Sequence, residues 1–136
     1  MDSDILIIAA TNCPFDLDDA ALRWFTRRIY VGMPDMEAWK AIIEHTLKDE
    51  EVKLASMTKI CEYLEGYSAS DITAICKEAA MGPVKEHPVQ KIVTLKRQDL
   101  RAIQDKDFYD AIKKIKPSYS SAKVKKFIDW ERSLTV

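Results

Sequence analysis

The spacing of hydrophobic residues divides the chain into two parts. In the first part, residues 5–10 (ILIIAA) form an unbroken apolar run, which predicts a strand that is covered on both faces. A short helical turn at 18–25 and a second short strand at 28–31 are predicted to follow. Two strands are too few to make a stable sheet. We therefore predict that residues 1–34 are an α/β remnant of something larger.

From residue 35 onward, apolar residues recur every three or four positions, which predicts amphipathic helices packed as a bundle. Local signals mark the helix ends: Asp35 can cap the first helix and Gly66 can end the second. Ser68 and Asp71 resemble a capping box for the third. The expected helices span about 35–47, 56–65, 68–81, 105–116 and 121–134. The residues predicted to face inward are Met36, Trp39, Ile42, Ile43, Leu47, Ile60, Cys61, Leu64, Ile72, Ile75, Cys76, Ala79, Phe108, Ala111, Ile112 and Ile115 in the bundle, and Val124, Phe127, Ile128 and Leu134 in the last helix.

Composition narrows the possible classes of function. The chain has 136 residues and a net charge of −1, so its overall charge favours neither nucleic acid nor an anionic membrane. No apolar run reaches the roughly 18 residues that a membrane-spanning helix needs. The N-terminus (MDSD) is acidic where a signal peptide is basic. The three cysteines are widely spaced, which indicates reduced thiols and therefore a cytosolic or nuclear protein. The cysteines and histidines also lack the spacing of metal ligands, so no metal site is expected.

Asn12 is the first candidate for chemistry, because it directly follows the predicted buried strand. In open parallel sheets, polar residues just beyond the carboxyl ends of the strands face the ligand crevice. An amide in that position can hold a water molecule or a phosphate oxygen. Asparagine is also common in turns, so an ordinary turn at Asn12 is the alternative interpretation.

Three arginines, Arg23, Arg27 and Arg28, follow within sixteen residues of Asn12. Arginine presents a planar, permanently charged fork that matches phosphate oxygens and can stabilise a transferring phosphoryl group. The alternative is a surface cluster paired with the nearby aspartates at positions 16, 18 and 19.

The segment 66–72 (GYSASDI) and His45 are weaker candidates. A helix that begins at this segment could receive part of a nucleotide at its N-terminus, or it could be no more than a capped helix start. His45, on the polar side of its helix, is more often a surface histidine than a ligand contact.

Taken in order, these segments resemble one family. The matching stretches are ATN at 10–12, LDDAALR at 17–23, RRIYV at 27–31, GYSASDI at 66–72, KEAAMGPVKE at 77–86 and DFYDAI at 107–112. The first four are similar to the C-terminal half of an AAA ATPase module. The last two, together with a terminal helix that contains Trp130, are similar to the meiotic clade, which contains spastin, katanin, fidgetin and the ATPase that disassembles ESCRT filaments. Within this clade, the stretches most resemble the spastin branch.

The resemblance implies a domain plan and a set of site residues. Residues 1–34 would end the large subdomain, 35–116 would be the helical lid, and 117–136 would be a helix that packs back on the large subdomain. Asn12 would be the sensor-1 residue near the γ-phosphate. Arg23 would be an arginine finger that reaches the ATP of the adjacent subunit. The residues implied in cofactor binding are His45, Gly66, Ala69 and Ser70.

For the complete protein, the resemblance implies ATP and Mg²⁺ as cofactors and a homo-hexameric ring. It further implies a protein substrate, such as a tubulin tail or an ESCRT subunit, and a cytoplasmic location at the cytoskeleton or endosome, or a nuclear one. Neither nucleic acid binding nor insertion into a membrane is implied. The implied activity is remodelling or severing of protein assemblies.

Three departures from the family pattern limit what this chain can do alone. Trp24 stands where relatives usually have a second arginine, and Ala69 stands where most have glycine. The sequence contains no Gly-x-x-x-x-Gly-Lys-Ser/Thr motif and no apolar strand that ends in Asp-Glu. We therefore expect the chain by itself neither to hydrolyse ATP nor to bind ATP and Mg²⁺ tightly. A free-standing, non-catalytic interaction or regulatory module is the alternative.

Overall fold

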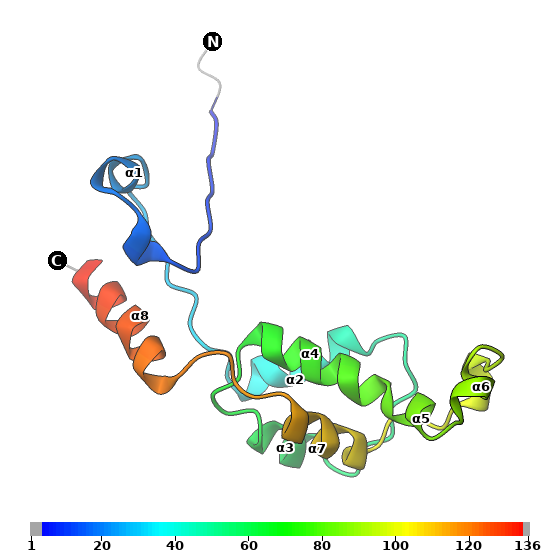
Figure 1. Cartoon of the computed structure of the whole chain (residues 1–136). Coiled ribbons are helices and arrows are strands. Elements are labelled where there is room, and N and C mark those ends of the chain that lie inside the picture. The colour runs from blue at the N-terminus through cyan, green and yellow to red at the C-terminus, as the bar shows by residue number, and fades with distance from the viewer. Residues whose placement is uncertain (1–3, 135–136) are drawn as a thin grey trace.

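Four helices pack around one core and form a bundle (Figure 1). They are α2 (Met36–Thr46), α3 (Met57–Glu62), α4 (Ala69–Ala80) and α7 (Asp105–Lys114), in a computed structural model that describes residues 4–134. Helix α4 lies centrally, against both α2 and α7. Residues 1–3 and 135–136, which the predicted domain boundaries include, lie outside the described residues.

The core of the bundle confirms the predicted inward faces. Its fully buried side chains come from all four helices and include Ile43, Ile60, Ile72, Ile75 and Phe108. Residues at the edges of the predicted stripes, such as Trp39 and Ile112, are partly buried against this core. Burying each large apolar side chain contributes about 1.5–3 kcal/mol, so this core accounts for most of the favourable burial in the bundle.

The predicted starts of α2 and α4 are confirmed, because their signals are local. Asp35 accepts a hydrogen bond from the Ala38 N–H at the start of α2. Helix α3 ends at Glu62, three residues before its predicted end, and Gly66 instead adopts the left-handed backbone (φ 85°) that closes the turn before α4. Ser68 and Asp71 form a reciprocal capping box at the start of α4.

Short elements complete the bundle at the end away from the termini (Figure 1). They are α5 (Gly82–Lys85), α6 (Val89–Ile92) and the 3₁₀ helix η2 (Arg97–Asp99). A single parallel bridge between Val52 and Ile103 then brings the chain back to α7.

The two predicted strands are not formed, which corrects the expectation of a two-strand remnant. Residues 5–10 are extended but unpaired, and the side chains at positions 5–8 are 71–83% exposed. Ile29 and Val31 in the second segment are 84% and 87% exposed. A strand exists only through hydrogen bonds to a neighbouring strand, and the described residues place none beside either segment. Among residues 4–134, β pairing is limited to the bridge at Val52.

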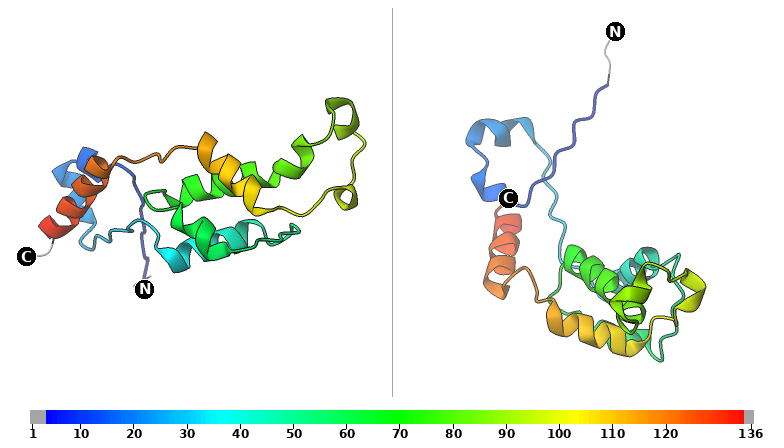
Figure 2. Two further views of the ribbon diagram at one scale, coloured as in Figure 1. Left: turned by 90° about the horizontal axis from the view of Figure 1, so that it is seen from below. Right: turned by 45° about the vertical axis from the view of Figure 1, so that its right-hand side comes forward.

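The N-terminal part is instead held by α8 (Ser121–Leu134). The Phe127 ring lies 5.4 Å from Phe15 and 6.3 Å from Tyr30, and Trp130 meets Phe15 edge-on at 6.5 Å. Both views of Figure 2 place α8 beside the N-terminal segment and apart from the bundle. This N-terminal part also contains the 3₁₀ helix η1 (Pro14–Asp16) and α1 (Asp19–Trp24).

Candidate functional site

The N-terminus of α4 is the best-formed candidate site, because it leaves hydrogen-bond donors free. Ser68 Oγ accepts from the Asp71 N–H (3.2 Å), and the Ser68 carbonyl accepts from the Ile72 N–H (3.0 Å). Within residues 4–134, no acceptor meets the N–H groups of Ala69 and Ser70, whose residues are both exposed. Free N–H groups at the start of a twelve-residue helix suit an anionic or polar ligand.

Asp71 ties this end of α4 to the linker before α8. Its carboxylate accepts hydrogen bonds from the Ser118 N–H (3.0 Å) and the Ser118 hydroxyl, in addition to the Ser68 N–H (3.1 Å). Burial alone would raise the pKa of Asp71, but the bonds from Ser118 and Ser68 outweigh it and hold the pKa below its ordinary value. The carboxylate is therefore charged at neutral pH.

Tyr67 makes a second connection to the same linker. Its hydroxyl donates to the Ile115 carbonyl at 2.8 Å. Burial, and then the charge of Asp71, raise the pKa of Tyr67, so the phenol remains a donor. The start of α4 is thus bonded to the linker at two points three residues apart.

Arg23 lies in the last turn of α1 with its side chain exposed. No carboxylate in residues 4–134 pairs with it, so the interpretation of an aspartate-paired cluster finds no support at this position. Asp18 instead caps α1 by accepting from the Ala21 N–H at 2.7 Å. Arg28 donates to the carbonyls of Leu22 (2.8 Å) and Phe25 (3.2 Å), which closes the C-terminal end of α1.

Trp24, next to Arg23, is 84% exposed. An indole of that size in water is unusual for a residue whose only role is structural. The exposed faces of Arg23 and Trp24 therefore make the end of α1 a candidate contact surface.

Asn12 lies at a hollow between the N-terminal segment and α8. The hollow has a volume of about 470 Å³ and is lined on the α8 side by Lys123, Lys126 and Phe127. Lys126 lies over the Phe15 ring at 5.4 Å, and Asp16 also lines the hollow, so its wall carries charges of both signs.

The structure brings together only some of the predicted site residues. Gly66, Ala69 and Ser70 lie at one end of α4, while Asn12 and Arg23 lie in the N-terminal part. Figures 1 and 2 both place α1 apart from α4. His45 is exposed in the last turn of α2.

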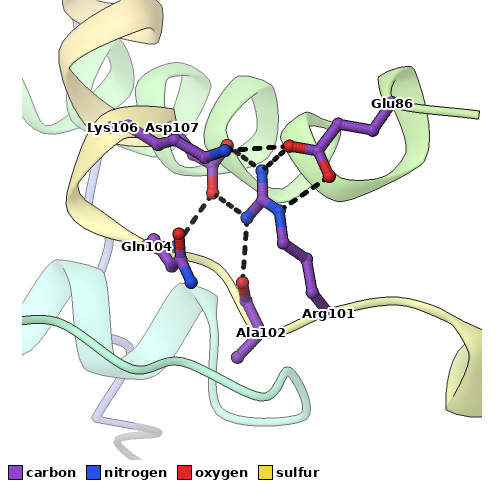
Figure 3. Close-up of polar contacts among 6 residues, drawn as sticks. All are labelled: Glu86, Arg101, Ala102, Gln104, Lys106 and Asp107. Carbon is purple, nitrogen blue, oxygen red and sulfur yellow. Dashed lines mark hydrogen bonds and ion pairs between the residues drawn. The ribbon is translucent and has the colours of Figure 1, made fainter.

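Sequence reasoning missed a charged cluster in the bundle, centred on Arg101 (Figure 3). The guanidinium donates two hydrogen bonds to Glu86 (2.7 and 2.9 Å), two to Asp107 (2.7 and 2.9 Å) and one to the Ala102 carbonyl (3.0 Å). These use all five of its N–H donors. Arg101, and then Lys106, lower the pKa of Glu86 to about 2.

The same cluster fixes the start of α7 and requires a glycine beside it. Asp107 accepts from the Gln104 N–H at 2.8 Å, and a Cβ built on Gly82 would lie 2.1 Å from an Asp107 oxygen. Every donor of Arg101 is satisfied and its partners are within the bundle, so the cluster is structural. It joins α5 to α7.

Two classes of site find no support in the described residues. Residues 4–134 contain no group of three His, Cys, Asp or Glu side chains that could hold a metal ion. In the same part of the chain, no helix combines the length and apolar character needed to cross a bilayer.

Comparison with known proteins identifies the class to which this bundle belongs. The AAA+ lid domain family matches residues 54–110, which cover most of the bundle and the start of α4. The chain is 37% identical to spastin of Naegleria gruberi over 131 residues, covering 95% of the chain and 25% of that protein. It is also 37% identical to spastin of Xenopus tropicalis over 133 residues, covering 96% of the chain and 22% of that protein. It thus spans a quarter or less of these relatives.

Solved structures agree with this assignment. A FIGL-1 AAA domain superposes with a TM-score of 0.83 at 30% identity, covering 93% of this chain and 43% of that one. A katanin structure that addresses katanin self-assembly shares the fold. Its TM-score is 0.77 at 24% identity, covering 88% of this chain and 44% of that one. The chain therefore belongs to the AAA ATPases. Within them it is a spastin-, katanin- and fidgetin-like C-terminal part, as its sequence motifs predict.

Proposed function

We propose that the chain is the C-terminal part of a subunit in a hexameric AAA ATPase, which couples ATP hydrolysis to severing or disassembling a protein polymer. Membership of the spastin-, katanin- and fidgetin-like group supports this activity. A microtubule or an ESCRT filament is the substrate class that the group suggests, and a cytoplasmic location follows from either.

The start of α4 would meet the nucleoside of ATP. The unused N–H groups of Ala69 and Ser70 fit a polar ligand, and Gly66 makes the turn that exposes them. His45 would lie beside the nucleoside. Bound ATP would supply the phosphoryl group for transfer, and Mg²⁺ would be held elsewhere in the complete protein, since residues 4–134 offer no cluster of metal ligands.

Arg23 would act on the ATP of the neighbouring subunit, and its exposure is the observation that carries the proposal. A guanidinium without a carboxylate partner in the described residues is free to meet phosphate oxygens across an interface. Asn12, in this proposal, positions the attacking water from the end of the extended segment 5–10. The exposed residues 5–8 would pair with neighbouring strands of the large subdomain.

The test uses the complete ATPase that contains this chain. Arg23→Ala should lower kcat by about 10³-fold or more while leaving ATP binding within a subunit nearly unchanged, because the finger acts on the adjacent site. Arg27→Ala is the matched control, since Arg27 is also exposed and also lacks a carboxylate partner in residues 4–134.

Mixed rings provide a second, independent measurement. Subunits with Arg23→Ala should regain part of their turnover when mixed with subunits that lack the P-loop lysine. If Arg23→Ala and Arg27→Ala both leave turnover intact, Arg23 is only a surface residue.

A further inference from the structure

The linker at residues 115–120 makes hydrogen bonds to the start of α4. Ser118 gives Asp71 two hydrogen bonds, one from its backbone N–H (3.0 Å) and one from its hydroxyl. Three residues earlier, the Ile115 carbonyl accepts from the Tyr67 hydroxyl. In Figure 1 this linker runs from α7 past the N-terminal end of α4 and then into α8.

The Asp71 carboxylate does more than a helix cap requires. A capping box uses the acid only to accept from the N-cap N–H, here that of Ser68. In this chain the carboxylate also accepts both donors of Ser118, 47 residues away, and only 6% of Asp71 is exposed. Hydrogen bonds to a charged, shielded carboxylate are stronger than neutral ones.

We propose that Asp71 and Ser118 form a latch that positions α8 relative to the start of α4. Through it, a displacement of α4 at Ala69 and Ser70 would be passed to α8. Helix α8 contacts Phe15 through Phe127, and both rings line the hollow that contains Asn12. Helix α8 thus gives the bundle a second connection to the N-terminal part, besides the covalent linker at 25–35, and the latch holds the linker through which this connection runs.

The transmission of a displacement from α4 to α8 is called the relay. It rests on the proposed function in one respect only, namely that ATP is the ligand at the start of α4. The latch itself requires no ligand. Asp71 and Ser118 are therefore positioning residues, and they can be tested in the 136-residue chain without nucleotide.

Three single substitutions separate the latch from the helix caps beside it. Ser118→Ala removes the hydroxyl that bonds Asp71 and leaves the capping box intact. Ser68→Ala removes the N-cap hydroxyl of α4 but keeps both Ser118 donors. Ser120→Ala removes the side-chain cap of α8, where Ser120 Oγ accepts from the Lys123 N–H at 3.2 Å.

The measurement is the distance between two spin labels, one on each part. Cys13 is exposed and takes the first label, and Glu62→Cys on α3 takes the second. Burial raises the pKa of Cys61, and it raises that of Cys76 to about 12, so both are poor targets for labelling. Far-ultraviolet circular dichroism verifies that each variant is folded.

Ser118→Ala should broaden the distance distribution. It should also speed exchange of the residue-118 amide about tenfold or more, because the amide bond to Asp71 that remains opens more often once the hydroxyl bond is lost. Ser68→Ala and Ser120→Ala should leave the distribution narrow. An unchanged distribution in Ser118→Ala would mean that the bond from the Ser118 hydroxyl does not position α8. Equal broadening in Ser68→Ala would assign the effect to fraying of α4, and either result overturns the latch.

The relay is tested in the complete ATPase. Ser118→Ala should lower kcat for ATP hydrolysis and leave KM close to that of the wild type. Full turnover, in a variant whose labels show a loosened α8, would overturn the relay. If the unmutated ATPase itself fails to hydrolyse ATP, the proposed function fails, while the distance measurement still decides the latch.

Discussion

The bundle and the N-terminal part differ in how many of the contacts that stabilise them come from within the part itself. In the bundle, α2, α3 and α4 each begin with a side-chain cap, the apolar stripes meet partners, and Phe108 and Ile72 are fully buried. In the N-terminal part, the most hydrophobic segment has no partner, and residues 5–8 lie mostly in water. The bundle is a folding unit by these criteria. The N-terminal part becomes ordered through what lies against it, which in this chain is α8.

The largest expected contrast between the two parts is in amide hydrogen exchange. Amides of residues 72–79 should exchange only through global unfolding, since they lie in the central helix of the core. Amides of residues 5–10 should exchange roughly 10³-fold faster or more, because the extended segment has no hydrogen-bonded neighbour among the described residues. Exchange at low protein concentration, followed by mass spectrometry or NMR, measures both.

Raising the concentration sharpens this test. An exposed, unpaired apolar segment is a template for pairing with another chain. Protection of residues 5–10 that grows with concentration would show that copies pair through it. Strong protection in the monomer would contradict the contrast drawn here.

Most of the bundle could be predicted from sequence, because its determinants lie within a few residues of one another. Ser68 and Asp71 are three positions apart, and Asp35 caps the residue three positions on. The prediction of strands at 5–10 and 28–31 was wrong. An apolar pattern indicates that a segment can form a strand, whereas the strand itself depends on neighbouring strands that the described residues do not provide.

Only those features of the candidate site that depend on residues close together in the sequence were predicted. The exposed start of α4 follows from the GYSASDI motif. Ser118 and Arg101 were missed, because they meet Asp71 and Glu86 across 47 and 15 residues, and no periodicity connects such distant positions. The roles of Asn12 and Arg23 remain predictions that await the complete ATPase.

A pair of matched substitutions provides the next largest effect. Ile72→Ala should lower the free energy of unfolding by about 2–5 kcal/mol, since it leaves a cavity in the fully buried core. Ile7→Ala changes the same side chain where it is 71% exposed, and it should act within about 0.5 kcal/mol. Urea titration of the two variants compares them directly. Similar losses in both would mean that residues 5–10 are covered in solution.

The smallest expected effect is the pH dependence of the bundle. Burial would raise the pKa of Asp107, but Arg101 and the Gln104 N–H outweigh it and keep the pKa below its ordinary value. The pKa of Asp71 is lowered as well. A carboxylate with a lowered pKa stabilises the fold fully above the ordinary value of about 3.9, and the contribution is lost as the pH falls through the folded-state pKa.

The free energy of unfolding should therefore decrease on acidification below about pH 4. Arg101→Met is the informative variant, because it removes the cation that lowers the pKa of Asp107. Its stability should be lower at neutral pH and should change less with acid. Parallel pH profiles for the variant and the unmodified chain would mean that Arg101 does not set the charge of Asp107.

The two linkers have a mechanical consequence. The chain enters the bundle through residues 25–35 and leaves it through 115–120, and both linkers lie at the same end of the bundle (Figures 1 and 2). A body attached at one end moves as a lever. Helix α4 has twelve residues, which at about 1.5 Å per residue gives an arm of about 18 Å. A rotation of about 10° at the attached end would therefore carry the far end of α4, with α5 beyond it, through an arc of about 3 Å.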